Sequence, residues 1–197
     1  MNADSGRLGI FGGTFNPVHL GHLRLAEDVR EEYALDRVVF IPANIPPHKK
    51  MRDAIDPAHR LRMVQLSIMG NAHFLCDDVE LRRGGISYTV DTIDHVYKTY
   101  AFEGMPAFII GSDLLGELGT WKDVGRLLDR TRFIVLMREG TGRIDPLLLP
   151  ERFAFFRKRK IDVTSSEIRG RLARGESIRY LVTDKVFQYI VDNDLYR

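Results

Sequence analysis

The sequence contains one cysteine, Cys76, among its 197 residues. A single thiol cannot form an intramolecular disulfide, so nothing in the composition calls for an oxidising compartment. The N-terminus lacks a basic segment followed by a long apolar run, and no apolar stretch approaches the roughly 20 residues that span a bilayer. We therefore expect a cytoplasmic protein without a membrane partner.

An excess of charge of either sign is also lacking. Lys and Arg together number 29, Asp and Glu 27, and the formal net charge is +2. A domain that binds nucleic acid usually carries a strong basic footprint, and the one basic run, residues 157–160, is more typical of a solvated face. We expect no nucleic-acid partner. Repeats, low-complexity tracts and linkers are absent as well, which favours one domain.

Strands and helices alternate along the chain. Apolar runs predict strands, and three- to four-residue apolar spacing predicts helices. The predicted strands lie at residues 8–11, 37–42, 74–76, 107–111, 132–138 and 160–164. The predicted helices lie at residues 20–33, 57–68, 87–100 (capped by Ser87 or Thr89), 165–175 and 182–193, while residues 146–156 stay unassigned.

This order predicts an α/β fold, a Rossmann-like doubly wound and mainly parallel sheet with helices on both faces. We expect residues 1–197 to form a single domain whose C-terminal helical part (about 164–197) packs on the sheet. Ligands of such sheets bind at the carboxyl ends of the strands. The polar stretches that fall there are residues 12–22, 110–113 and 163–169.

The stretch GGTFNPVHLGH follows the first predicted strand. Gly12 and Gly13 allow a tight turn and a close approach of the backbone to a ligand, and the helix start that follows favours a phosphate. The stretch matches neither the P-loop nor the dinucleotide fingerprint. His19 and His22 stand three apart, on one side of a helix start, where imidazoles with partial positive charge can face phosphoryl oxygens. A zinc pair is disfavoured, because no partner ligands with suitable spacing occur elsewhere.

Six ordered motifs, spread over nearly the whole chain, resemble the bacterial nicotinate mononucleotide adenylyltransferases of the HxGH nucleotidyltransferase superfamily. They are GGTFNPVHLGHL, IPANIPPHK, ISYTVDTI, IIGSD with a tryptophan eight residues on, VTSSEIR and VFQYIVDNDLY. Class I aminoacyl-tRNA synthetases share HxGH, but the chain is too short for one and lacks a KMSKS-like loop. The family usually has ISSTxIR where this chain has VTSSEIR, and the hydroxyls are preserved.

The resemblance implies that the phosphate of nicotinate mononucleotide attacks the α-phosphate of ATP and that pyrophosphate leaves. Positioning and charge stabilisation suffice for such a step, because the attacking phosphate is already ionised at pH 7. Mg²⁺ is the implied cofactor, held mainly by the ATP phosphates and water rather than by a carboxylate cage.

The resemblance also assigns residues to roles. The catalytic residues are His19, His22 and Lys49. The ATP-binding residues are Gly12, Gly13, Thr14, Phe15, His19, His22, Gly111, Asp113, Ser165, Ser166 and Arg169. The mononucleotide-binding residues are Asn16, His48, Lys49, Thr89 and Trp121.

Several alternatives stay open. Taken alone, Asp113, Thr89 and the threonine or serines of VTSSEIR, followed by Glu167, are also typical of helix caps. Trp121 is equally typical of a partly buried core, and the loop with Lys49 of solvent exposure. Nicotinamide mononucleotide, or the substrate of a pantetheine-phosphate or choline-phosphate nucleotidyltransferase, remains an alternative substrate. So does a nucleotide sensor without catalysis. The oligomeric state is open too, because the final helices can pack on the sheet or on a second copy.

Overall fold

Six parallel strands form one sheet in the order β3-β2-β1-β4-β5-β6. The structure is a computed structural model that describes residues 6–47, 55–137, 150–157 and 162–197. The strands are β1 (Leu8–Gly13), β2 (Arg37–Pro42), β3 (Phe74–Cys76), β4 (Ala107–Gly111), β5 (Arg132–Leu136) and β6 (Phe153–Phe156). The strand order reverses direction at β1, which creates a crevice between the carboxyl ends of β1 and β4.

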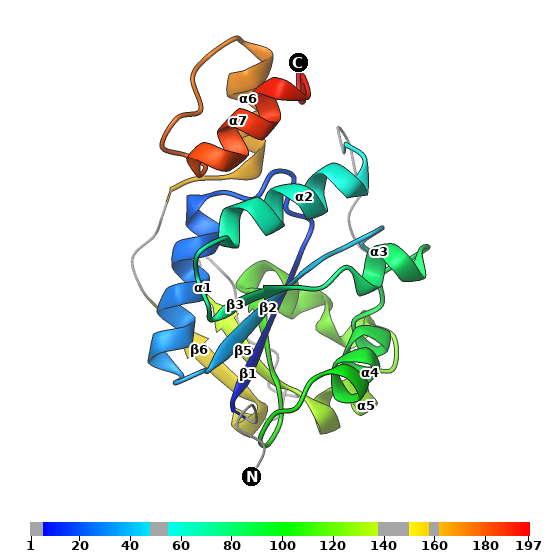
Figure 1. The fold of residues 1–197 in the computed structure, drawn as a ribbon. Helices are drawn as coiled ribbons and strands as arrows, with labels where there is room; N and C mark the ends of the chain where they lie inside the picture. The colour runs from blue at the N-terminus through cyan, green and yellow to red at the C-terminus, as the bar shows by residue number, and fades with distance from the viewer. Residues whose placement is uncertain (1–5, 48–54, 138–149, 158–161) are drawn as a thin grey trace.

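Helices cover both faces of the sheet (Figure 1). They are α1 (Leu20–Glu32), α2 (Pro57–Ile68), α3 (Val79–Arg83), α4 (Thr89–Thr99), α5 (Val124–Arg130), α6 (Ser165–Ala173) and α7 (Asp184–Asp192), with 3-10 segments η1 (Ser112–Thr120) and η2 (Pro150–Arg152). The predicted fold class is confirmed. None of the helices in the described part of the chain has both the length and the apolar content needed to cross a membrane.

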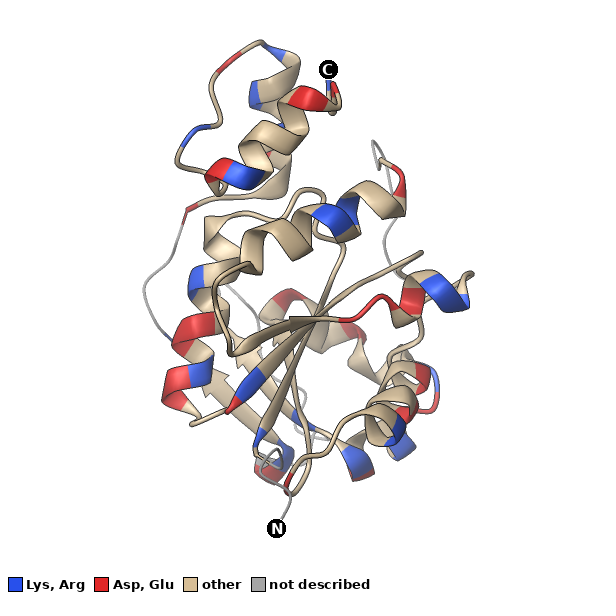
Figure 2. Cartoon of the chain, in the orientation of Figure 1, with Lys and Arg blue, Asp and Glu red and all other residues tan. Residues whose placement is uncertain are grey.

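Two hydrophobic cores lie on opposite faces of the sheet because strand side chains alternate. Phe11 belongs to the core that includes Val29 of α1 and Met63 of α2. Its neighbour Ile10 belongs to the core that includes Ile93 of α4 and Leu127 of α5. Burial on both faces explains why the strands read as continuous apolar runs in the sequence. Charged residues of both signs are interspersed along the helices that cover them (Figure 2).

The C-terminal helices lie beside α2 at the carboxyl edge of the sheet (Figure 1). The hydroxyl of Tyr189 on α7 lies 2.8 Å from Nδ1 of His59 on α2. The segment between α6 and α7 accepts a hydrogen bond at the Leu181 carbonyl from the Leu20 N–H, 2.9 Å away, at the start of α1. Residues 164–197 are therefore attached to the segment that follows β1.

Two expectations about the elements are wrong. Of the strand predicted at residues 160–164, residues 162–164 are not in a strand, because β6 takes the edge of the sheet and the chain then leads to α6; residues 160 and 161 lie outside the described residues. Neither Ser87 nor Thr89 caps α4: Tyr88 is the N-cap residue and forms no side-chain cap. The Ser87 hydroxyl instead accepts from the Asn44 N–H at 2.9 Å.

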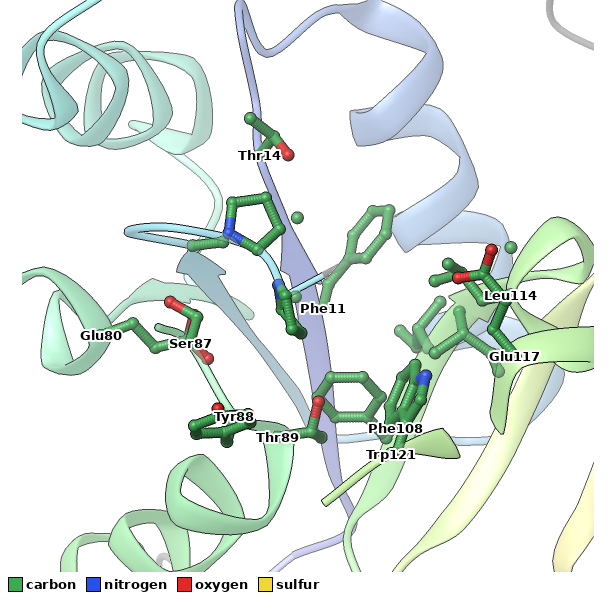
Figure 3. A pocket seen from close by; sticks show the side chains of 18 of the residues that line it. Phe11, Thr14, Glu80, Ser87, Tyr88, Thr89, Phe108, Leu114, Glu117 and Trp121 are labelled. Carbon is green, nitrogen blue, oxygen red and sulfur yellow. The ribbon is translucent and has the colours of Figure 1, made fainter. Parts of the chain in front are cut away.

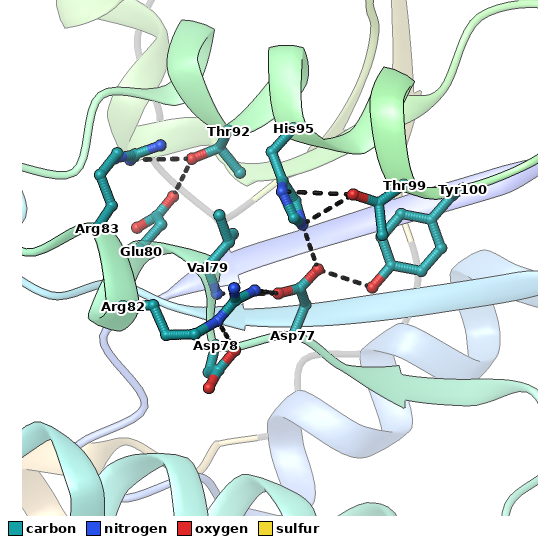
Figure 4. Close-up of polar contacts among 10 residues, drawn as sticks. All are labelled: Asp77, Asp78, Val79, Glu80, Arg82, Arg83, Thr92, His95, Thr99 and Tyr100. Carbon is teal, nitrogen blue, oxygen red and sulfur yellow. Dashed lines mark hydrogen bonds and ion pairs between the residues drawn. The ribbon is translucent and has the colours of Figure 1, made fainter.

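A buried carboxylate joins β3 to α4 (Figure 4). Oδ2 of Asp77 accepts from the Tyr100 hydroxyl at 2.8 Å and lies 2.7 Å from Nε2 of His95, while Oδ1 accepts from the Val79 N–H at 2.9 Å. Burial alone would raise the pKa of Asp77, but these hydrogen bonds hold it below its usual value. The ionised carboxylate therefore stabilises the fold at neutral pH.

We predict that Tyr100→Phe lowers the free energy of unfolding by about 2 kcal/mol at pH 7, because a hydrogen bond to a buried charge is lost. The folded-state pKa of Asp77 is depressed, so the contribution is complete above the unfolded-state pKa and disappears as the pH falls through the folded-state pKa. Urea denaturation of the wild type and the variant, at pH 7 and at a pH below the folded-state pKa of Asp77, measures how much stability the hydrogen bond contributes in each state. Tyr97→Phe, which removes an exposed hydrogen bond to the Arg130 carbonyl, is the control and should change stability by less than about 0.5 kcal/mol. Equal losses in the two variants would contradict the prediction.

Candidate active site

A pocket of about 630 Å³ opens at the carboxyl edge of the sheet, within the size range of small-ligand sites. The turn after β1, the end of β4, η1 and the start of α4 line it (Figure 3). Seven of the predicted site residues line this pocket, namely Gly12, Gly13, Thr14, Thr89, Gly111, Asp113 and Trp121. The sheet reversal and the sequence motifs thus point to the same place.

Close packing explains the glycine at position 13. A Cβ there would lie 2.9 Å from Cζ of Phe15, closer than side chains approach one another. Phe15 is buried, and its backbone adopts the left-handed conformation (φ 48°), which costs a bulky residue about 1 to 2 kcal/mol. The turn is therefore held in a strained shape that places the Phe15 ring against the ring of His22, with centroids 5.1 Å apart.

His19 and His22 lie side by side at the start of α1. Their ring centroids are 3.7 Å apart, and the His19 N–H donates to Nδ1 of His22 at 3.3 Å. Because this nitrogen accepts, a neutral His22 carries its proton on Nε2. His19 is the N-cap residue and is buried, and its Nδ1 has no hydrogen-bond partner among the described residues.

Burial lowers the pKa of His19 to about 4. The expectation that both imidazoles carry partial positive charge is therefore wrong for His19, which is neutral at pH 7 in the absence of ligand. Two stacked rings this close could not both be charged without repulsion. His19 can still donate a hydrogen bond to an anion as a neutral imidazole.

Helix α6 contacts the segment between β1 and α1, which carries His19. The Ser165 hydroxyl donates to the Pro17 carbonyl at 2.9 Å, and the Arg169 guanidinium donates to the Asn16 carbonyl at 2.8 Å. The Thr164 hydroxyl accepts from the Glu167 N–H, so the capping interpretation of this motif is confirmed for Thr164. The first-turn N–H groups, which include that of Ser166, lack intrahelical acceptors and favour an anion.

Two residues near this segment were not identified from the sequence. The Tyr196 hydroxyl donates to Oδ1 of the buried Asn16 at 2.8 Å, and burial raises the pKa of Tyr196. The fully buried Arg60 of α2 donates to the Thr14 carbonyl at 2.7 Å. Arg60 lies within an ordinary amphipathic helix pattern, so no local signal marked it. Tyr196 is the last residue of the motif VFQYIVDNDLY, but the motif assigned it no role in the site.

The end of β4 forms the opposite wall of the pocket. Oδ1 of Asp113 lies only 2.2 Å from where a Cβ on Gly111 would be, so any larger residue at position 111 would force the Asp113 carboxylate to move. Asp113 does not cap η1; the N-cap residue is Gly111. Trp121 packs edge-on against Phe108, with ring centroids 6.4 Å apart, and its buried Nε1 has no partner among the described residues. The pocket and core interpretations of Trp121 are therefore compatible.

The third wall is the N-terminus of α4. Tyr88 and Thr89 line the pocket where the helix begins without a side-chain cap, so its first N–H groups and its positive dipole end lie there. Lys122 lies 4.7 Å above the Tyr88 ring, and its ammonium donates to the carboxylate of Asp91 in the first turn of α4 at 3.2 Å, so its charge is paired. Glu80 lies deeper, 2.5 Å from the Thr92 hydroxyl, and burial raises its pKa despite hydrogen bonds from Thr92 and Ser87.

The predicted residues thus form two adjoining groups. One group lines the pocket, and the other surrounds the segment after β1 and consists of Phe15, Asn16, His19, His22, Ser165, Ser166 and Arg169. The two groups meet at Thr14 and Phe15. His48 and Lys49 lie outside the described residues.

A doubly wound parallel sheet, two glycines at the carboxyl end of β1 and a paired-histidine helix start are the features of a class of enzymes: the protein is a nucleotidyltransferase. The comparisons agree. Residues 10–171 match the family model described as cytidylyltransferase-like. A "Probable nicotinate-nucleotide adenylyltransferase" of Syntrophotalea carbinolica is 42% identical over 97% of this chain and 97% of its own length. A protein of the same name from Desulfitobacterium hafniense (strain Y51) is 38% identical over 100% of this chain and 99% of its own. The chain belongs to the nicotinate-nucleotide adenylyltransferase family.

Solved structures share the fold. The Plasmodium falciparum nicotinic acid mononucleotide adenylyltransferase complexed with NaAD matches with a TM-score of 0.73 at 19% identity, covering 97% of both chains. The same enzyme complexed with APC gives a TM-score of 0.72. At this identity the likeness establishes the common architecture alone.

Proposed function

We propose that this enzyme transfers the adenylyl group of ATP to nicotinate mononucleotide and releases pyrophosphate. One observation carries the proposal. In a single pocket, the glycines that end β1 adjoin an aromatic side chain, Trp121, and the uncapped N-terminus of α4. A phosphate-binding turn and a site for a flat, anionic ring therefore lie side by side, as the joining of two nucleotides requires. The high identity to named relatives over their full length supports the same activity.

The phosphates would lie along the segment from Gly12 to His22. An oxygen of the mononucleotide phosphate forms the new bond to the α-phosphorus as the bond to the β-phosphate oxygen breaks. Neither bond change requires a protein nucleophile or a proton. His19, His22 and Arg169, with the N-terminus of α6, would donate hydrogen bonds to the oxygens on which charge develops. His48 and Lys49, from the loop after β2, would bind a substrate phosphate.

The pyridine ring would stack on Trp121, and its carboxylate would face the start of α4. The first N–H groups of this helix favour an anion over a neutral carboxamide, because the helix dipole adds to the hydrogen bonds. Asp113 would accept from a ribose hydroxyl of ATP, beside the close approach that Gly111 permits.

We propose Mg²⁺ as the cofactor that accompanies ATP. No group of three or more His, Cys, Asp or Glu side chains suited to a metal ion occurs in the described ranges. The site offers separate carboxylates, such as Asp113, which fits a cation that is held by phosphates and water. When bound, the ion neutralises charge on the triphosphate. The chain's own part is to orient the phosphates through the turn, the histidines and α6.

We propose that residues 1–197 act as one catalytic unit that operates in the cytoplasm. The contacts of Ser165, Arg169 and Tyr196 with the segment after β1 support this unity, because they attach the C-terminal helices to the site itself. ATP and the mononucleotide are the partners we propose, without nucleic acid. Homo-oligomer formation through the C-terminal helices is a separate question that sedimentation of the full chain would answer.

The test is pyrophosphate release from ATP and Mg²⁺, measured in parallel with nicotinate mononucleotide and nicotinamide mononucleotide. We expect fast release with the acid and much slower release with the amide. Equal rates would retain adenylyl transfer and overturn the assignment of the α4 N-terminus to a carboxylate. Absence of release with both would overturn the proposed reaction, and phosphopantetheine would then be the substrate to test.

A further inference from the structure

The buried Arg60 of α2 carries a charge that has no obvious structural counterpart. Its side chain is fully buried, and its hydrogen bonds to described residues are with backbone carbonyls rather than with a carboxylate. Asp56, just before α2, attracts the charge only at longer range, without an ion pair among the described residues. Burial lowers the pKa of the Arg60 guanidinium, which nevertheless remains protonated because an arginine loses its proton only far above neutral pH. Burying a cation without an anion costs stability. We therefore expect Arg60 to serve the function of the site in a way that offsets this loss of stability.

The contacts of Arg60 are all with backbone carbonyls of the pocket's two loops. It donates to Thr14 after β1 at 2.7 Å, and to Ala43 and Asn44 after β2 at 2.7 and 3.3 Å. Thr14 and Ala43 line the pocket, whereas Arg60 does not. The guanidinium therefore draws these carbonyl oxygens away from the ligand side of both loops.

The direction of the Thr14 carbonyl also determines the direction of the next N–H group, that of Phe15. In a planar trans peptide the C=O of one residue and the N–H of the next point in opposite directions. Because the Thr14 carbonyl points toward Arg60, the Phe15 N–H points toward the ligand side. The Phe15 N–H forms no hydrogen bond with another of the described residues. The left-handed backbone of Phe15 is a strained conformation that needs such an external hold.

Arg60 also fixes the backbone of the loop after β2. The Ala43 carbonyl points toward Arg60, and the Asn44 N–H, on the opposite side of that peptide, donates to the Ser87 hydroxyl. Arg60 therefore fixes one loop that faces the phosphates and another that joins the pyridine end of the pocket.

We propose that Arg60 is a positioning residue for adenylyl transfer, which turns the Phe15 N–H toward the transferred phosphate and fixes the distance between the two substrate subsites. This inference rests on the proposed function. The fork of Arg60 reaches three carbonyls from two loops at once. Lysine, with a single ammonium at the end of a flexible stem, cannot reproduce this geometry.

The test compares Arg60→Lys with a matched control on the same helix, Val64→Ala. Val64 is also fully buried, faces the hydrophobic core and is outside the pocket. For Arg60→Lys we expect kcat to fall about 100-fold, as for other misplaced catalytic geometries. For Val64→Ala we expect kcat to stay unchanged. Urea denaturation of both variants shows whether their losses of stability are similar. If Arg60→Lys fails to fold, Arg60→Gln, a neutral side chain with two donors, replaces it.

A binding measurement distinguishes a loss of phosphate positioning from a general disturbance of the fold, and it does not depend on turnover. Calorimetric titration with ATP alone, without a second substrate, should give about 10-fold weaker affinity for Arg60→Lys, corresponding to one lost hydrogen bond. Adenosine has no phosphate, and its affinity should stay the same. Equal losses for ATP and adenosine, or equal kinetic losses in both variants, would overturn the proposal. An inactive wild-type enzyme would instead overturn the proposed function, and the comparison of ATP with adenosine would still test Arg60.

Discussion

Replacing His19 by alanine should lower kcat about 1000-fold, the upper range for removal of one preorganised donor to a developing oxyanion. His19 is buried at the N-cap of α1, stacks on His22, and has a ring nitrogen without a partner among the described residues. A ligand oxygen would provide that partner. The measurement is steady-state pyrophosphate release with both substrates saturating. The fold should persist, because the backbone hydrogen bond from position 19 to His22 remains available.

His73→Ala is the control for this variant. His73 is exposed beside β3, where its ring contacts the Asp36 carbonyl, and it is outside the pocket. Its replacement should leave kcat unchanged. A kcat for His19→Ala within a few-fold of the wild-type value, together with a higher KM for ATP, would indicate that the ring only binds nucleotide. That result would favour a sensor-like role for the pair and contradict the catalytic assignment.

The ionisation of His19 allows a sharper comparison. Since its pKa is about 4 in the free protein, the ring acts at pH 7 as a neutral donor unless bound phosphate supplies a counter-charge. His19→Gln retains a neutral donor and should recover part of the activity lost in His19→Ala. Recovery in His19→Lys instead would indicate that positive charge, rather than a directed hydrogen bond, is what the site requires.

The sequence predicted the elements whose signal is local. Five of the six strands and the principal helices follow from apolar runs and periodicity, because each buries its own face of a doubly wound sheet. The sixth strand, Phe153–Phe156, was missed because it has four residues and follows a stretch without periodicity. Asp162–Thr164 had the composition of a strand, but the edge of the sheet was already occupied.

The residues of the site also differ in whether a local sequence signal marks them. Glycines, histidines and Trp121 were found because their motifs are contiguous and their chemistry is distinctive. Arg60 was not found, and Tyr196 stood at the end of a motif without an assigned role. The roles of both arise from contacts 46 and 180 positions away in the chain, with Thr14 and Asn16 respectively. The low pKa of His19 was also beyond prediction, because it results from burial rather than from residue type. Sequence thus identifies groups that can touch a ligand more readily than groups that hold them in place.

Gly13→Ala tests directly whether the contact between Gly13 and Phe15 holds the paired histidines in place. The added Cβ would lie 2.9, 3.1 and 3.2 Å from three carbons of the Phe15 ring. The ring is buried and packs against Phe11 as well as His22, with centroids 5.6 and 5.1 Å away, so it cannot simply rotate aside. We expect kcat to fall about 100-fold, because the displacement passes to His22, and the free energy of unfolding to fall by about 1 to 3 kcal/mol, as in other overpacked cores.

Gly125→Ala provides the matched control. Gly125 lies in α5, where a Cβ meets nothing within 4 Å, and alanine in a helix is more stable than glycine by roughly 0.5 to 1 kcal/mol. That variant should keep its activity and gain stability. If Gly13→Ala lost stability but kept kcat, the Phe15 ring would not transmit the displacement to His22. The strained turn would then serve the core rather than the reaction. A loss of kcat confined to Gly13→Ala would instead show that the spacing between the turn and the paired histidines is set by the contact between Gly13 and Phe15.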